Sequence, residues 1–131
     1  MAIIGVSLAR NADTAQRVVI EFSCDPSVAV NDVVYQSSAA DETVLRFTNN
    51  TEVSQAIGVC IEKINATTCK VLVLGVVPGF TGLTRGGRIF LTDTGTLSNV
   101  KPSAGYLHNL GVAISATEIL FIPNNIRVMQ T

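Results

Sequence analysis

Charged residues are scarce in this sequence. Asp, Glu, Lys and Arg make up 15% of the chain, whereas about 25% is usual for a globular domain. The nine basic residues are scattered and the net charge is −1, so the dense basic patch that neutralises nucleic-acid phosphates is missing. Hydrophobic residues reach 47%, with a mean hydropathy of +0.41. This composition predicts exposed apolar contact surface, and we expect a homo-oligomer (a dimer or trimer) or a protein docked on a larger body.

Long apolar runs are also missing. The longest, Val71–Val77, has seven residues and is followed by Pro78, whereas a transmembrane helix needs about 20. No basic leader precedes an apolar stretch at the start of the sequence. We therefore expect no membrane association, and synthesis in a cytosol.

Cysteine and histidine number only three and one. The odd count of Cys24, Cys60 and Cys69 argues against a secreted disulfide framework. With only His108 beside them, no zinc pattern can be assembled at normal ligand spacing. No nucleophile elbow pairs with His108, so we interpret it as a surface or half-buried strand residue. The sequence predicts no metal site and no cofactor.

Two segments resemble catalytic motifs but fit turns better. Gly79–Gly87 is glycine-rich, yet it lacks the lysine of a phosphate-binding loop and leads into Arg88–Leu91, which has the pattern of a strand rather than a helix. Asp93–Gly95 matches the aspartic-protease triplet, but a hairpin turn explains it without chemistry. No sequence feature requires Asp32 to face Asp93 as a catalytic pair. We therefore do not expect an enzyme.

Short β-branched runs separated by turn residues dominate the chain, and no segment keeps a 3.6-residue apolar period over three turns. Leu72–Val77 is apolar on both faces, which predicts a central strand or one that lies under a partner. Strands are expected at Arg17–Cys24, Asp32–Gln36, Thr43–Thr48, Ala56–Lys63, Cys69–Val77, Arg88–Thr92, Leu107–Ser115, Glu118–Ile122 and, in the tail, Ile126–Met129.

An internal repeat organises these strands. It predicts two similar β units and a closing strand at Glu118–Ile122, because closure removes exposed sheet edges. The expected fold is all-β, a compact antiparallel barrel or a jelly-roll-like sandwich. Three pairs of segments match at offsets of 52 to 55 residues: Val18–Phe22 with Lys70–Leu74, Asp32–Tyr35 with Gly87–Phe90, and Ile57–Ile61 with Leu110–Ile114.

A string of motifs between about Val18 and Ile122 carries a resemblance. The segments are Val30–Tyr35, Ile57–Val59, Gly79–Thr84, Arg88–Leu91, Gly95–Leu97, Lys101–Pro102 and Leu110–Ser115. Together they resemble small structural proteins of tailed bacteriophages, namely capsid cement or decoration proteins and related modules of tail-fibre-like proteins. This sequence departs from the commonest form in its three cysteines and in Asn31, where glycine usually precedes the aspartate.

The resemblance implies a virion protein that lies on the capsid surface after synthesis in the host cytoplasm. It would bind the major capsid protein and staple neighbouring coat subunits. The alternative is a receptor-binding or tail-fibre-type adhesion module that recognises a host surface glycan. Glycan sites usually need exposed aromatic platforms, and this chain has no Trp and only Tyr35 and Tyr106, which counts against the alternative.

The β domain is expected at residues 16–123, between an N-terminal arm at 1–15 and a C-terminal tail at 124–131. Asn11–Thr14 separates the apolar part of the arm from the first strand, which suits addition to the sheet edge of a neighbour. The tail follows Pro123, which ends the preceding strand, and is expected to pack on a partner or cover a sheet edge. The predicted partner-binding residues are Ile3, Ile4, Val6, Leu8, Ile126 and Val128.

Cys60 and Cys69 are nearly equidistant from the middle of one predicted hairpin connection. In a regular hairpin they would face each other, with Cα atoms close enough for a disulfide. A reducing cytosol disfavours that bond, although release into an oxidising medium would permit it. The other interpretation is a pair of free thiols that fill small spaces in the core. Cys24 is expected to be a reduced core residue.

Overall fold

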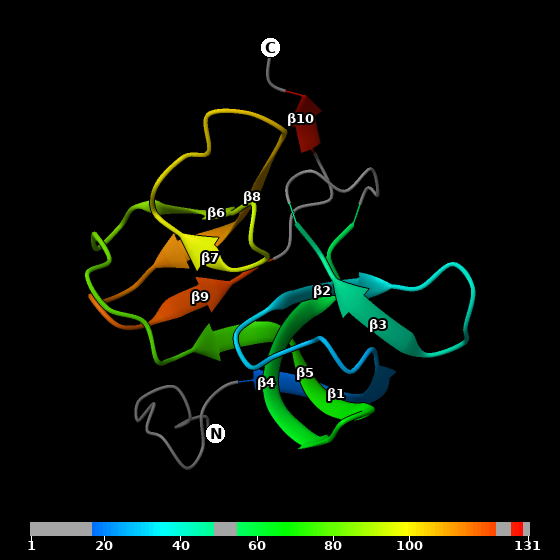
Figure 1. The fold of residues 1–131 in the computed structure, drawn as a ribbon. Helices are drawn as coiled ribbons and strands as arrows, with labels where there is room; N and C mark the ends of the chain where they lie inside the picture. The colour runs from blue at the N-terminus through cyan, green and yellow to red at the C-terminus, as the bar shows by residue number, and fades with distance from the viewer. Residues whose placement is uncertain (1–16, 49–54, 123–126, 130–131) are drawn as a thin grey trace, which may run out of the picture.

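The computed structural model describes residues 17–48 and 55–122 and, for the backbone alone, residues 127–129. These residues form strands, turns and bends and no helix, as the missing 3.6-residue period predicts. Figure 1 shows the ten strands: β1 (Arg17–Cys24), β2 (Val33–Gln36), β3 (Thr43–Arg46), β4 (Gly58–Asn65), β5 (Thr68–Val77), β6 (Arg88–Leu91), β7 (Leu97–Ser98), β8 (Tyr106–Ala113), β9 (Ile119–Phe121) and β10 (Arg127–Met129).

The first five strands form a closed barrel, at the lower right of Figure 1. Their order is β1-β3-β2-β4-β5, and β5 pairs back to β1. The β1–β3 contact is parallel and the other four contacts are antiparallel. The parallel contact joins only Ser23 to Thr43 and Cys24 to Val44, so the barrel closes at the end of β1 alone.

Beyond the barrel, β5 continues into an open sheet with the order β5-β9-β8-β6-β7, at the upper left of Figure 1. β10 pairs with the first part of β8, where Val128 lies opposite Leu107. The protein is therefore of the all-β class that the sequence predicts, with a barrel at one end and an open sheet at the other.

The predicted internal repeat is present in the strand pairings. In the first unit β2 pairs with β3 and β4, and β4 forms a hairpin with β5. In the second unit β6 pairs with β7 and β8, and β8 forms a hairpin with β9. The register agrees as well, because Val34 lies opposite Gly58 and Ile89 lies opposite Gly111. β9 is thus the last strand of the second unit, as the first part of β5 is the last strand of the first unit.

One predicted match between the units is wrong in register. The sequence analysis matches Val18–Phe22 with Lys70–Leu74. In the structure Val19 lies opposite Leu72 in the first unit, and the residue at the same place in the second unit is Val76, which lies opposite Leu120. The reason is that β5 serves both units: its first part closes the first unit, and its last residues begin the second. A strand that is apolar on both faces carries little register information.

Two apolar clusters fill the molecule, one inside the barrel and one between the barrel wall and the open sheet. Val71 and Leu72 are neighbours on β5, yet they enter different clusters and both are fully buried. β2 and β4 divide their residues in the same way. Each of these strands has buried side chains on both of its faces. Burial on both faces accommodates the high proportion of apolar residues in this chain.

Asn31 has a backbone conformation that few residues adopt. Its φ is 76°, in the left-handed region that glycine occupies freely and asparagine tolerates better than most residues. Glycine at this position would meet the same backbone demand.

Asn31→Val is therefore expected to lower the free energy of unfolding by about 1–2 kcal/mol, because a β-branched side chain is strained at this φ. Asn31→Gly should stay within about 0.5 kcal/mol of the wild type, since the relief of strain is offset by a more flexible unfolded chain. Urea titration measures both variants. Equal midpoints for the two would contradict the argument.

Candidate assembly surface

The open sheet has an apolar outer side. Along β9, Ile119 and Phe121 are fully buried in the cluster against the barrel, so Leu120 points to the opposite side. Leu120 lies opposite Val112 on β8 and Val76 on β5. We call this side the outer apolar face, and its exposed or half-buried apolar side chains are Val18, Leu74, Phe90, Val112, Leu120 and Ile122.

The outer apolar face runs over five neighbouring strands, β1, β5, β9, β8 and β6. Val18 on β1 lies opposite Leu74 on β5, and the two are 49% and 47% exposed. Val112 is 38% exposed and neighbours the charged Arg88 on β6. A solvated antiparallel sheet normally turns polar side chains outward. An apolar face in that position is typical of a surface that another molecule covers.

β1 also offers a free backbone edge. On the side away from β5, the described residues pair with β1 only at Ser23 and Cys24. The amide of Ser23 donates to the carbonyl of Glu42 at 3.0 Å, so by alternation the N–H groups of Val19 and Glu21 point to the same side. The edge from residue 17 to residue 22 therefore has unpaired backbone groups next to the outer apolar face, which is a template for strand addition.

The predicted partner-binding residues fall mostly outside the described chain. Ile3, Ile4, Val6, Leu8 and Ile126 lie outside the described residues. Val128 belongs to β10 and pairs with Leu107 through the backbone. The structure describes this strand by its backbone alone.

The sequence analysis did not single out the residues of the outer apolar face as candidates for partner binding. Two short segments, Val18–Ile20 and Ile119–Ile122, are apolar at every position. This lack of alternation between polar and apolar residues was the signal that could have indicated the face. A strand with one solvated face would have alternated.

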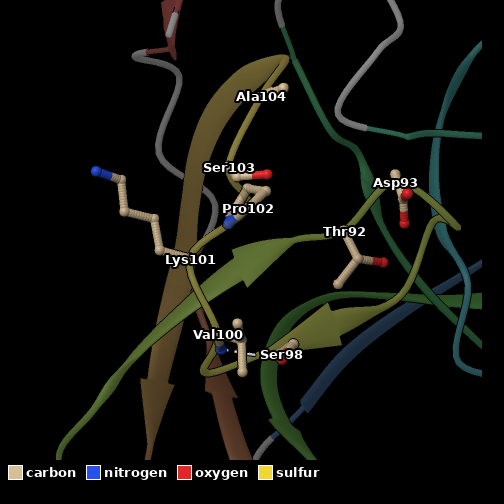
Figure 2. A pocket seen from close by; sticks show the side chains of 8 residues that line it. All are labelled: Thr92, Asp93, Ser98, Val100, Lys101, Pro102, Ser103 and Ala104. Atoms are coloured by element: carbon tan, nitrogen blue, oxygen red, sulfur yellow. Dashed lines mark hydrogen bonds between the residues drawn. The ribbon is translucent and has the colours of Figure 1, made fainter.

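A hollow with a volume of about 520 Å³ lies between the turn after β6 and the loop after β7. In Figure 2, Thr92 and Asp93 line one side while the loop from Val100 to Ala104 lines the other. Lys101 extends away from Thr92 and Asp93 (Figure 2). The lining is mainly hydroxyl, backbone and aliphatic groups, and none of the described residues that line it is aromatic.

Asp93–Gly95 forms the hairpin turn that the sequence predicts. Gly95 has a φ of 90°, and the hydroxyl of Thr92 accepts hydrogen bonds from the amides of Thr94 and Thr96. Gly86 has a φ of 82° in the turn before β6, a conformation that glycine adopts freely, so this part of Gly79–Gly87 is a turn, as predicted.

Asp32 has a structural role. Its carboxylate accepts hydrogen bonds from Arg46 Nε and from the amide of Ala29, both at 2.8 Å, and the residue is 5% exposed. Arg46 also donates to the carbonyl of Ser27 at 2.5 Å. These bonds tie the loop before β2 to β3, and they leave Asp32 engaged in an ion pair.

His108 lies on a strand, as predicted, but it is buried rather than exposed or half-buried. It is 1% exposed, and its ring packs edge-on against Phe47 with centroids 4.9 Å apart. Tyr106 lies on the same side, at 6.5 Å. The sequence could not show this, because the aromatic partner Phe47 is 61 residues away in the chain.

The three cysteines meet inside the barrel as free thiols, and all are buried. The predicted direct opposition of Cys60 and Cys69 is wrong. The β4–β5 hairpin shifts register twice, so Cys60 lies opposite Val71 and Cys69 lies opposite Lys63. Cys69 nevertheless interacts with both other thiols. The interpretation as free core thiols is confirmed.

Burial controls the ionisation of these thiols. It raises the pKa of Cys60, because a thiolate loses its hydration inside the barrel. Burial and then the neighbouring thiols raise the pKa of Cys69 to about 12. Raised pKa values make thiols poor nucleophiles at neutral pH.

Within the described residues, no three His, Cys, Asp or Glu side chains are grouped to hold a metal ion. No helix in that part of the chain is long and apolar enough to cross a membrane. No protein-family model matches the sequence, and no curated protein is similar to it. The outer apolar face and the adjoining β1 edge are therefore the features from which a function can be argued.

Proposed function

We propose that the protein is a capsid cement or decoration protein, which binds the outer surface of a phage head and stabilises contacts between coat subunits. The observation that carries the proposal is the outer apolar face, which joins a free strand edge on a compact, weakly charged β fold. The resemblance of the motif string supports the same role.

The mechanism follows from the chemistry of that face. Covering a half-exposed Val, Leu or Ile removes apolar area from water and contributes about 1 kcal/mol. Four such residues of the face are about half-exposed or somewhat less, so one site gives modest affinity. If the face bridges two coat subunits, separating them exposes it again. Many sites on one lattice then add by avidity.

Mutation of the face tests the proposal. Val112→Lys is expected to weaken co-sedimentation with purified empty shells by more than tenfold, because binding would bury a charge in an apolar contact. Val100→Lys is the matched control, since Val100 is 73% exposed and lies in the loop after β7, outside the strands of the face. Thermal melting should show both variants folded. Loss of binding by Val100→Lys alone would contradict the proposal.

The alternative function is an adhesion module that recognises a host surface glycan. The hollow of Figure 2 is the place where a glycan would bind, and its hydroxyl groups suit one. The missing aromatic platform counts against it. Adsorption of the purified protein to host cells, abolished by a change in the hollow such as Asp93→Ala, would support this alternative.

Deletion of Met1–Leu8 is expected to leave the chain folded but weaken oligomerisation or shell binding, because the arm is predicted to contact a partner and not the core. Sedimentation velocity and shell co-sedimentation measure the two effects. Unchanged assembly and unchanged shell binding would rule out the arm as a contact.

A further inference from the structure

We propose that the free edge of β1 receives the N-terminal arm of a second copy of this chain, which adds to β1 as an extra strand. This proposal names a partner for the assembly surface, and it rests on the proposed function for the role that self-association would play. It is tested on the isolated protein without shells, so its failure is distinguishable from a failure of shell binding.

The receiving edge is long enough for a strand. It runs from residue 17 to residue 22, and the N–H groups of Val19 and Glu21 point outward from it, as the Ser23 bond to Glu42 shows. Val18 and Ile20 are 49% and 46% exposed and share one side of β1. An added strand would satisfy the backbone groups and cover these two side chains.

The arm has the pattern of such a strand. Ile4, Val6 and Leu8 alternate with Gly5 and Ser7, which is the period of a strand with one apolar face. Added to β1, the apolar residues of the arm would lie on the side of Val18 and Ile20, which is also the side of Leu74 and Val71 on β5. Backbone pairing supplies affinity and the alternate side chains supply register in this mode of recognition.

The internal repeat indicates which segment of the chain would pair with the free edge of β1. The last residues of β5 begin the second unit, as β1 begins the first. Gly75 on β5 pairs with Phe121 of β9 on one side and with Arg17 of β1 on the other. The first strand of the second unit is thus flanked by a strand from earlier in the chain. The corresponding side of β1 is its free edge, and the arm is the sequence that precedes it.

The connection between arm and β1 favours a second copy over the same chain. Ala9–Gln16 has eight residues with no glycine and no proline, whereas hairpin loops usually have about 2–5 residues and use glycine or asparagine–glycine to reverse direction. Extended, eight residues span up to about 26–29 Å. The segment therefore suits an arm that leaves its own domain and reaches a neighbour.

Cross-linking between two tagged forms of the full chain tests the proposal. One form carries Ser7→Cys and the other Glu21→Cys, because these side chains would share the polar side of the added strand. The native thiols are buried and should not react with a short bismaleimide in the folded protein. A cross-linked dimer that contains both tags is expected, whereas each form alone should give at most a small fraction of that product.

Two results would overturn the proposal. A chain with both substitutions that cross-links only within itself would show that each arm covers its own β1. No cross-link in either arrangement would show that the arm does not reach this edge. As a second measurement, Val6→Pro should raise the dissociation constant for self-association about tenfold, because proline removes a donor from the added strand. Val6→Ala, which keeps the donor, should raise it less, and equal effects would count against strand addition.

Discussion

Gly58→Ala and Gly111→Ala are each expected to lower the free energy of unfolding by roughly 3 kcal/mol. A Cβ at Gly58 would overlap the carbonyl oxygen of Leu72, and a Cβ at Gly111 would overlap that of Leu120. Both oxygens belong to the backbone, so no side chain can rotate to make room. The β4–β5 and β8–β9 hairpins would have to separate locally.

The matched control is Gly82→Ala. Nothing lies within 4 Å of a Cβ there, but the φ of Gly82 is +69°, so the substitution introduces backbone strain without overlap. It should cost about 1 kcal/mol. Urea titration of the three variants gives the comparison. A cost at Gly58 or Gly111 no larger than that at Gly82 would show that the close backbone approach does not limit these positions.

The same two glycines show how much of the fold the sequence could predict. Both stand in matched segments, and the structure gives them the same task in equivalent hairpins. The repeat therefore predicted the architecture of two units and a closing strand correctly. Most predicted strands lie within one or two residues of those observed. The short strand β7 was missed, because Leu97–Ser98 has too few residues to show a period.

The candidate surface was harder to predict, for a physical reason. Whether an apolar residue is covered depends on which strands pair and in which register, and β5 is apolar on both sides. The pattern alone could not show that Leu72 is buried while Leu74 is 47% exposed, since a register shift in the β1–β5 pairing falls beside these residues. His108 illustrates the same limit, because its burial depends on a distant aromatic ring.

Stability is expected to fall as the pH rises above about 9, by on the order of 2–3 kcal/mol between pH 9 and pH 11. A cysteine thiol in the unfolded chain ionises near its ordinary pKa of 9.0, whereas the pKa of Cys69 is raised to about 12 in the folded protein. Between these values the unfolded state releases a proton that the folded state keeps. The contribution of the thiol to stability is therefore complete below pH 9 and is lost as the pH rises toward 12.

Urea titration from pH 8 to pH 11 measures this effect. Tyrosine and lysine also titrate in that range, so the informative quantity is the difference between the wild type and Cys69→Ala. The variant should start less stable, because it leaves a small cavity, but should lose less stability with rising pH. Identical pH slopes for the two proteins would contradict a buried thiol with a raised pKa.

The same burial predicts strong protection from alkylation. In the folded protein at pH 8, Cys24, Cys60 and Cys69 are expected to react with iodoacetamide at least about 10³-fold more slowly than in urea, because reaction must wait for unfolding. Denaturation without reductant followed by alkylation then counts the free thiols by intact mass. Three modifications are expected. A single modification would mean that two of the cysteines form a disulfide, and since Cys69 interacts with both others, mapping the modified residue would identify the bonded pair.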